Sequence, residues 1–400
     1  MKDQNHLLND QQAIERIFDH IDNNTTDLGD EVWREPVENY FSQERFNQEI
    51  QLLRRLPVPF CPSAALPDKG SYIARQASGT PLLTVRGDDG TVRSFINACR
   101  HRGMQVAQGS GCSNKAFVCP YHAWSYSLDG KLKNIPGEEA FPGIDKNDNG
   151  LVQVEAVEKG GIVYVQQEGS IDKNFIDNVL DYFHPDQEMF NQSEANDKTN
   201  WKLLTETLLE GYHIKSLHKK TFFPYGLDNI NLVETFGPNS RVIFPFRRIE
   251  KLREIKSEDR KIDGTVTKVY HLFPNTSVSM LSKHSNLTVM EPIAPNEVKT
   301  ITYSMANVNS SGQRVSNEDA QKDLKFVNEQ GQSEDREAAT AIFKTVTAKA
   351  NSHLTFGYFE KAIVNFHQQL TKMLLVLLMI SFYPKFYSSI NVTLSNLCYY

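Results

Sequence analysis

The sequence predicts an α+β protein in which a small antiparallel β domain precedes, or is inserted in, a second domain built on an antiparallel sheet. Between residues 71 and 167, short β-rich runs are separated by Gly-Asp, Asp-Gly and Pro-Gly steps, which mark turns. Five segments of alternating apolar and polar residues lie between residues 241 and 305, as expected for half-buried strands. The charged stretch at residues 317–349 is predicted to be one long helix, and we expect it to cover the second sheet.

The first residues of the chain are predicted to be helical. Ile14 and Ile17 belong to an apolar stripe with the spacing of a helix. Ser42 is a suitable N-cap for a second helix, which must end before Pro57. We therefore assign residues 1–56 to an N-terminal helical segment.

Composition bounds the possible functions. The 400 residues allow two domains, and 40% hydrophobic residues are enough for a substantial core. The net charge of −6 does not indicate a nucleic-acid partner. Of five cysteines, Cys61, Cys112 and Cys398 show no disulfide spacing, which suits a reducing cytoplasm. No apolar signal segment follows Met1, so we expect a cytoplasmic protein.

Two Cys/His pairs stand out within the β-rich region. Cys99 and His101 form the first pair, and Cys119 and His122 form the second. Each pair mixes a thiolate and an imidazole, which suits a Rieske [2Fe–2S] centre because one of its irons takes two Cys and the other two His. A structural zinc site with two Cys and two His would use the same four ligands, although zinc motifs order them differently.

A second group of metal-binding residue types follows. Glu206, Glu210 and His213 stand at i, i+4 and i+7, so they would share one face of a helix. Polar groups among leucines are costly to bury unless something binds them. His218 is off this stripe, but a bend near Gly211 would return it to the same metal. Taken alone, the two histidines could also be ordinary surface residues.

A ferrous site with two His ligands needs one carboxylate more. The acidic cluster Glu334-Asp335-Arg336-Glu337 offers candidates on the predicted C-terminal helix. By itself, such a cluster is more often a solvated helix face.

These motifs together resemble those of the alpha subunits of Rieske non-haem iron oxygenases. The first loop continues as Arg102-Gly103, and the second ends at Trp124; both resemble the cluster loops of this family. Ala123 occupies a position where the family often has Gly. The spacing Glu210-x-x-His213-x4-His218 resembles the family's iron-binding motif.

The resemblance assigns roles to individual residues. It implies that Cys99, His101, Cys119 and His122 bind the [2Fe–2S] cluster. It implies that His213, His218 and an acidic residue bind a mononuclear Fe(II). Asp335 is our choice for that acid, and Glu334 and Glu337 are the alternatives. Glu210 takes the place of the family's bridging carboxylate, which is not a ligand but links a cluster His of the neighbouring subunit to an iron-binding His.

The resemblance also implies an activity and a domain plan. We expect a Rieske domain at residues 57–168 and a helix-grip catalytic domain at residues 169–371. The expected function is a terminal oxygenase, either a monooxygenase or a dioxygenase, that uses O₂ to hydroxylate, dihydroxylate or demethylate a small organic substrate. Because no Gly-rich dinucleotide motif is present, a separate NAD(P)H-dependent reductase must supply electrons, directly or through a ferredoxin. The family typically forms homotrimers, with or without a beta subunit.

Several alternatives remain open at this point. A Rieske-type electron carrier would explain the Cys/His pairs alone, and a helix-grip ligand-binding protein would explain the second domain alone. The substrate could be an aromatic or a quaternary-ammonium compound, since an aromatic pocket suits both. Residues 372–400 form an atypical apolar tail that could be disordered, contact another subunit or reflect a non-native reading frame. Its apolar run is too short to span a bilayer, so we expect no membrane span.

Overall fold

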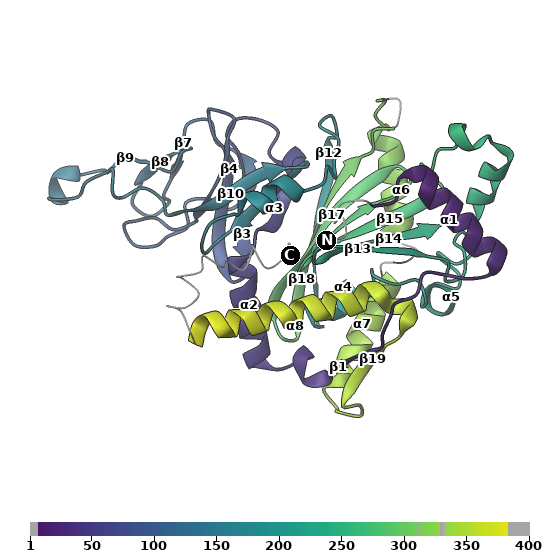
Figure 1. Cartoon of the computed structure of the whole chain (residues 1–400). Coiled ribbons are helices and arrows are strands. Elements are labelled where there is room, and N and C mark those ends of the chain that lie inside the picture. The colour runs from purple at the N-terminus through teal and green to yellow at the C-terminus, as the bar shows by residue number, and fades with distance from the viewer. Residues whose placement is uncertain (1–6, 310–311, 329–330, 332, 383–400) are drawn as a thin grey trace. The chain divides into compact units, whose positions relative to one another are not determined.

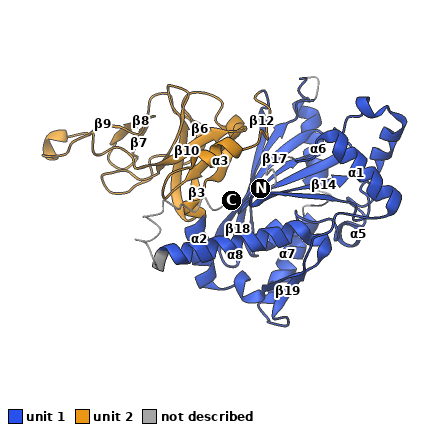
Figure 2. Cartoon of the chain, in the orientation of Figure 1, with its two compact units in different colours: residues 1–52, 186–400 blue, residues 53–185 orange. Residues whose placement is uncertain are grey.

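The computed structural model describes residues 7–309, 312–328, 331 and 333–382 (Figure 1). The chain divides into two compact units (Figure 2). The first unit consists of residues 1–52 and 186–400, and the second of residues 53–185. Along the sequence, the second unit thus lies between the two segments of the first.

The unit formed by residues 53–185 is a small antiparallel β structure with two sheets. Seven strands form the larger sheet in the order β2-β11-β10-β5-β4-β3-β6, and β7, β8 and β9 form a second, three-stranded sheet. The bounds of the elements are β2 (Val58–Pro62), β3 (Ser71–Ala77), β4 (Thr80–Arg86), β5 (Val92–Ile96), β6 (Gly109–Cys112), β7 (Ala116–Val118), β8 (Ser125–Ser127), β9 (Leu132–Asn134), β10 (Gln153–Lys159), β11 (Ile162–Gln166) and α3 (Lys173–Asn178), with short 3₁₀ turns η2 (Ser63–Ala65) and η3 (Glu138–Ala140).

A hairpin turn in this unit shows how local sequence and packing agree. Gly130 lies in the turn between β8 and β9 and has a φ of +83°. A Cβ atom added there would meet the ring of Phe95 at 2.4 Å, so both the backbone conformation and the close approach require glycine. Phe95 belongs to the buried core of this unit, together with Trp124, Tyr126 and Cys99.

The other unit is built on a seven-stranded antiparallel sheet with the order β12-β18-β17-β16-β15-β14-β13. A separate pair, β1 and β19, completes its β structure among the described residues. The strands are β1 (Trp33–Pro36), β12 (Met189–Asp197), β13 (Leu232–Phe236), β14 (Asn239–Pro245), β15 (Val266–Leu272), β16 (Thr276–Met280), β17 (His284–Ala294), β18 (Glu297–Ala306) and β19 (His353–Phe356).

Helices surround this sheet. They are α1 (Asp10–Asn23), α2 (Gln43–Arg55), α4 (Trp201–Glu206), α5 (Ile214–Leu217), α6 (Asn317–Val327), α7 (Ser333–Val346) and α8 (Lys361–Phe382), with 3₁₀ turns η1 (Val37–Tyr40), η4 (Arg247–Glu254), η5 (Ser257–Asp259) and η7 (Tyr358–Glu360). Helix α2 crosses the boundary between the two units.

Helices cover both faces at the β13–β14 end of the sheet. Ile14 and Ile17 of α1 pack with Ile243 of β14 in one buried cluster. On the opposite face, the ring of Phe366 of α8 lies 5.1 Å from that of His271 of β15. The packing of α1 follows from its sequence, because its apolar residues form one stripe and a capping box at Asn9 fixes its start.

The predicted fold class is confirmed: a small antiparallel β domain accompanies a catalytic unit of antiparallel sheet and helices. The two N-terminal helices and the five predicted segments of the second sheet are present. Two strands of that sheet, β12 and β13, were not anticipated, because their polar residues hide the alternation.

The prediction of one long helix at residues 317–349 was wrong, because this stretch is divided between two helices, α6 and α7. The longest C-terminal helix is instead α8, which packs against β13 and β14 and continues through the apolar run at residues 373–380. By length and composition alone, Tyr358–Ile380 could span a membrane, but a core helix of a soluble protein passes the same test. Of the predicted apolar tail, residues 383–400 lie outside the described residues.

Candidate metal centres

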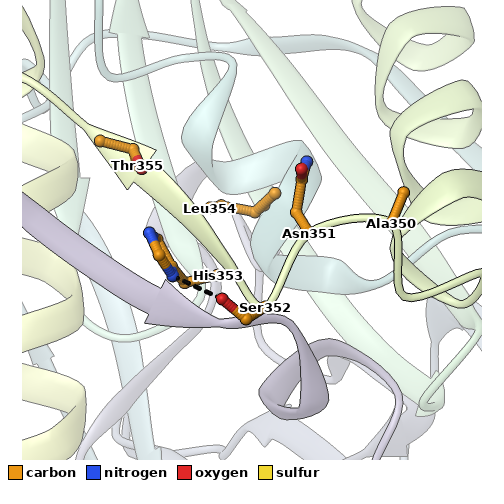
Figure 3. A pocket seen from close by; sticks show the side chains of 6 residues that line it. All are labelled: Ala350, Asn351, Ser352, His353, Leu354 and Thr355. Carbon is orange, nitrogen blue, oxygen red and sulfur yellow. Dashed lines mark hydrogen bonds between the residues drawn. The ribbon is translucent and has the colours of Figure 1, made fainter.

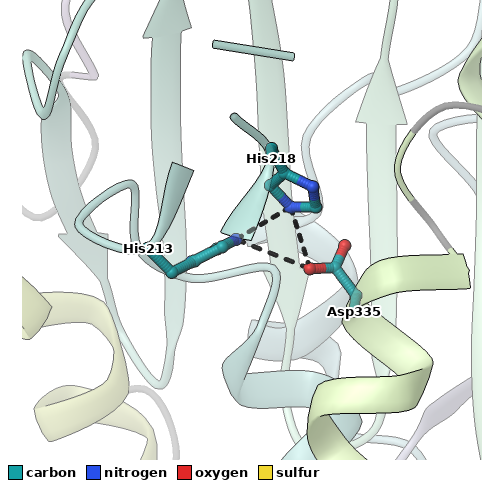
Figure 4. Close-up of side chains that lie close together, drawn as sticks. All are labelled: His213, His218 and Asp335. Carbon is teal, nitrogen blue, oxygen red and sulfur yellow. Dashed lines mark hydrogen bonds and ion pairs between the residues drawn. The ribbon is translucent and has the colours of Figure 1, made fainter. Parts of the chain in front are cut away.

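Three predicted ligand residues converge in the unit that holds the large sheet (Figure 4). The Nε2 atoms of His213 and His218 lie 3.2 Å apart. Oδ1 of Asp335 lies 3.0 Å from Nε2 of His218 and 3.5 Å from Nε2 of His213. Two imidazole nitrogens and one carboxylate oxygen therefore face a common point. This donor set fits a ferrous ion of the kind held by two His and one carboxylate.

Each imidazole is held from its other side by a second carboxylate. Nδ1 of His213 contacts Oε1 of Glu210, whose other oxygen accepts the His213 backbone N–H at 3.1 Å. Nδ1 of His218 lies 2.7 Å from Oε2 of Glu334, which also accepts the hydroxyl of Thr221. When Nδ1 carries the proton, Nε2 is left free to bind a metal, so these acceptors select the ligating tautomer.

The local backbone explains how two histidines five residues apart meet. His213 and His218 flank the single turn of α5, as its N-cap and C-cap. Gly211 precedes this turn, and a Cβ there would lie only 2.5 Å from the side chain of Asn231. The chain can therefore bend closely past β13 only with glycine at this position.

The prediction that Glu206, Glu210 and His213 share one helical face was wrong. Helix α4 ends at Glu206, so Glu210 and His213 lie in the following turns. Glu206 points elsewhere: its Oε1 accepts from the hydroxyl of Tyr40 at 2.8 Å and lies 2.9 Å from Nε2 of His367. After Glu206 the chain continues in tighter turns, in which the N–H groups of Leu208 and Leu209 donate to the carbonyls of Thr205 and Glu206.

At this site, charged partners and burial shift the pKa values of the ligand residues in opposite directions. Burial lowers the pKa of His213, but hydrogen bonds to Asp335 and Glu210 outweigh it and raise this pKa to about 10. The pKa of His218 is also raised, against burial, by Asp335 and Glu334. The pKa of Asp335 is lowered, since its bonds to both histidines outweigh the desolvation that would raise it. Without a metal, protons thus occupy the positions that a cation would take.

The two Cys/His loops lie in the other unit. Cys99 and Cys119 are buried, whereas His101 is half-buried and His122 is exposed. The two imidazole rings are 4.7 Å apart. Two buried thiols and two neighbouring imidazoles fit the ligand set of a Rieske cluster.

The loops have matching backbone turns. The N–H of Gly103 donates to the carbonyl of Cys99, and the N–H of Ala123 donates to that of Cys119. Both turn residues have positive φ, +76° at Gly103 and +59° at Ala123. Ala123, the departure from the family pattern, thus occupies a left-handed conformation that glycine adopts more easily.

Aromatic residues pack against these loops, and one of them, Tyr126, was not predicted from the sequence. The hydroxyl of Tyr126 lies 3.2 Å from Sγ of Cys99 and accepts the N–H of Arg100 at 2.9 Å. Trp124, which the sequence motif does include, stacks on His101 at 5.0 Å. Tyr126 lies two residues beyond the recognised motif, and β8 brings it back to the first loop. No local sequence pattern marks such a contact.

A surface hollow lies apart from these centres. Figure 3 shows its lining on the segment that leads into β19, where Ser352 and His353 are hydrogen bonded at 2.9 Å. It contains none of the predicted site residues. It is lined by Ala350, Asn351, Ser352, His353, Leu354 and Thr355.

Comparison with known families assigns both units. Residues 57–171 match the Rieske [2Fe–2S] domain, and residues 186–375 match the catalytic domain of the ring hydroxylating alpha subunit. The chain therefore carries a Rieske domain followed by a catalytic domain of the kind found in ring-hydroxylating alpha subunits. The two cofactors of such chains are a [2Fe–2S] cluster and a mononuclear iron, as predicted.

Curated relatives match the chain over shorter segments. The chain is 36% identical over 161 residues to the oxygenase subunit of glycine betaine monooxygenase from Chromohalobacter salexigens, which covers 38% of this chain and 36% of that protein. It is 29% identical over 208 residues to the oxygenase subunit of carnitine monooxygenase from Acinetobacter pittii, covering 47% and 53%. The matched segments thus span about a third to a half of these curated relatives.

Solved structures share the fold. The quaternary ammonium Rieske monooxygenase CntA in complex with L-carnitine aligns with a TM-score of 0.70 and 19% identity, covering 84% of this chain and 93% of that one. Naphthalene 1,2-dioxygenase from Rhodococcus sp. aligns with a TM-score of 0.67 and 17% identity, covering 90% and 97%.

Proposed function

We propose that this chain is the terminal oxygenase component of a multicomponent system that uses O₂ to oxidise a small organic substrate. The observation that carries the proposal is the convergence of His213, His218 and Asp335 in a chain that also has a Rieske domain. An electron carrier would need only the Rieske domain, and a ligand-binding protein would need no such triad.

In this proposal, Cys99 and Cys119 bind one iron of the cluster, and His101 and His122 bind the other. His213, His218 and Asp335 bind the mononuclear iron. These assignments are supported by the two buried cysteines with neighbouring imidazoles, and by the convergence of the three ligand atoms. The Rieske and catalytic domains are proposed to extend over residues 57–168 and 169–371, with residues 1–56 and 372–400 as flanking segments.

The chain's own residues then orient and tune the site. When bound, the cluster supplies single electrons and the mononuclear iron activates O₂. Glu210 and Glu334 hold Nδ1–H of the two histidines, which directs both Nε2 atoms toward Oδ1 of Asp335. His213, His218 and Asp335 would hold the iron through three donors, which would leave it free to bind O₂ and react with substrate.

The proposed partners follow from the missing dinucleotide-binding motif and from the resemblance to Rieske oxygenases. We propose an NAD(P)H-dependent reductase, acting directly or through a ferredoxin, and a cytoplasmic homotrimer, with or without a beta subunit. In such a trimer, Glu210 would link the cluster of one subunit to His213 of the next. Inter-subunit electron transfer in a quaternary ammonium Rieske monooxygenase of known structure supports this arrangement. The substrate is proposed to be a quaternary-ammonium or an aromatic compound, the classes named for the relatives.

Metal counting tests the proposal directly. Anaerobically purified and reconstituted protein should hold three irons per chain, two of them in a cluster with a Rieske spectrum. The variant His218→Ala should keep two irons and the spectrum but lose substrate-dependent O₂ uptake with a surrogate reductase. A fully loaded protein with only two irons, or one that binds zinc in place of the cluster, would contradict the proposal.

A further inference from the structure

One face of the large sheet carries six polar side-chain atoms that are buried without a hydrogen-bond partner among the described residues. Every parent residue is at most 3% exposed. Leaving such a group buried and unpaired destabilises the folded protein, so each of these atoms needs an explanation. The atoms are Ser240 Oγ, His271 Nδ1, Ser277 Oγ, His284 Nε2, Asn286 Oδ1 and Ser304 Oγ.

Strand register places all six on the same face. Ser240 pairs with His271, and His271 pairs with Ser277, across β14, β15 and β16. Ser277 pairs with Thr288 of β17, and Asn286 and His284 lie two and four residues before Thr288 on that strand. Directly paired residues share a face, as do alternate residues along one strand.

The sixth residue extends the row to the next strand. Asn286 of β17 pairs with Ser304 of β18. The six atoms thus form one continuous polar surface across β14 to β18. We call it the polar row.

This face is covered by helices α8 and α6. Phe366 of α8 packs on His271, and Asp323 of α6 lies 2.8 Å from Nδ1 of His284. The ring of Phe366 also lies 5.7 Å from that of Trp201 of α4, and α4 contacts both β17 and α7. Asp335, a proposed iron ligand, lies in the first turn of α7. The polar row therefore faces the layer of helices to which Asp335 belongs.

The chemistry of the row defines what would bind there. His271 donates from Nε2 to the carbonyl of Pro274, which leaves Nδ1 as an acceptor. His284 donates from Nδ1 to Asp323, and its Nε2 has no partner among the described residues. Oδ1 of Asn286 is a second acceptor, and the three serine hydroxyls can donate or accept. No lysine or arginine belongs to the row.

We propose that the polar row binds a hydrogen-bond-donating group of the substrate, a hydroxyl or an amine, and thereby determines substrate specificity. This inference rests on the proposed function, because it treats the covered face as part of the substrate site. It selects, within the proposed substrate classes, molecules that carry an O–H or N–H group. A site built for such a group discriminates strongly against analogues that lack it, because its own polar atoms are then left unpaired.

Probe pairs that differ by one donor test this inference. L-carnitine and γ-butyrobetaine differ by a hydroxyl, and anthranilate and benzoate differ by an amine. Calorimetric titration of the reduced, iron-loaded full chain without O₂ would measure the affinity for each probe. We expect the donor-bearing member of at least one pair to bind about tenfold more tightly or better. The variant Asn286→Leu, nearly isosteric, should abolish that preference, and Ser277→Ala should reduce it.

A matched control lies on the same strand. Ser285 points to the opposite face, where its hydroxyl donates to Asn307 at 2.6 Å, so Ser285→Ala should leave the preference unchanged. The melting temperature of each variant without ligand separates substrate binding from a structural role, because losing a structural hydrogen bond would lower it. Because Ser277→Ala removes a buried polar atom that has no partner, its melting temperature should not fall, whereas that of Ser285→Ala should.

The outcomes separate the inference from the proposed function. Equal affinities within both pairs, or a preference that survives Asn286→Leu, would overturn the role of the polar row, and so would a failure of every probe to bind. If the polar row binds only water, none of the probes will bind. Iron content and O₂ uptake are measured independently, so the oxygenase proposal can stand when this inference fails.

Discussion

At the scale of single residues, two adjacent carboxylates at the iron site have different partners. Asp335 directs Oδ1 toward the Nε2 atoms of both histidines, and its side chain is only 12% exposed. Glu334 is 31% exposed and reaches the far side of His218 at Nδ1. The sequence offered Glu334, Asp335 and Glu337 as candidates for the third ligand. The structure supports Asp335 because its carboxylate alone among the three joins both histidines.

Iron binding should separate the two carboxylates. In Asp335→Asn we expect the mononuclear iron to be lost, because the charged donor is removed. In Glu334→Gln we expect retention with affinity weakened about 10- to 100-fold, since only the orientation of His218 changes. Anaerobic iron titration measures both, with the two cluster irons as an internal standard. Loss of iron in Glu334→Gln with retention in Asp335→Asn would reverse the assignment.

Tyr126 should raise the reduction potential of the cluster. A hydrogen bond from its hydroxyl to Sγ of Cys99 stabilises the more negative, reduced state. Such a bond is worth about 1 kcal/mol, which corresponds to about 40 mV for one electron. Redox titration of Tyr126→Phe should therefore show a lower potential with an unchanged Rieske spectrum. An equal or higher potential would show that the hydroxyl does not donate to the sulfur.

At the scale of elements, a buried network ties three segments together. Glu206 ends α4, Tyr40 ends η1 and His367 lies within α8. All three are buried, and Glu206 contacts both partners. Burial raises the pKa of Glu206 to about 8 and lowers that of His367 to about 4. Both groups are therefore neutral in the folded protein near pH 7.

Glu206 should make stability fall as pH rises. In the unfolded chain its pKa is near 4.5, so at neutral pH folding takes up a proton that the unfolded chain has released. The stabilisation is complete below pH 4.5 and is lost as pH rises toward about 8. Between pH 6.5 and 8 the deprotonation of His367 in the unfolded chain offsets only a small part of this loss, so the free energy of unfolding should fall by about 1 kcal/mol.

Denaturant titration of wild type and Glu206→Gln at pH 6.5 and 8 checks this expectation. The variant keeps a neutral side chain of similar shape at both pH values, so its free energy of unfolding should change less between them. A variant with the same pH dependence as the wild type would show that Glu206 is ionised in the folded state.

At the scale of the whole molecule, each compact unit carries one predicted metal centre. The Cys/His loops belong to residues 53–185, and the His213, His218 and Asp335 group belongs to the other unit. Oxygenase activity requires electrons to pass from the first centre to the second. Glu210 is the candidate for this connection, because it contacts His213 at Nδ1 and its side chain is 10% exposed.

Glu210→Ala should uncouple the two centres. We expect it to retain both metals and the Rieske spectrum but to lose turnover, because His213 loses its Nδ1 partner and the proposed link to a neighbouring cluster. Rapid mixing of the reduced protein with substrate and O₂ would measure oxidation of the cluster directly. The variant Glu210→Asp, which keeps a carboxylate, is the matched comparison. Full activity in Glu210→Ala would exclude the bridging role.

The sequence by itself determined the two sets of ligand candidates and the class of fold. The Cys/His pairs and the His213-x4-His218 spacing are local patterns, because each pair of donors comes from one short loop. The alternation of β14 to β18 is also local, so five strands could be predicted from residue order alone.

Only the tertiary structure decided which distant residues complete these sites. Asp335 joins His213 across more than a hundred residues, and Tyr126 reaches Cys99 from another strand. The side chain of Glu206, at the end of α4, contacts Tyr40 and His367, which lie far away in the chain. Burial and long-range hydrogen bonds fix such contacts, and they override the local helical spacing that placed Glu206 beside Glu210.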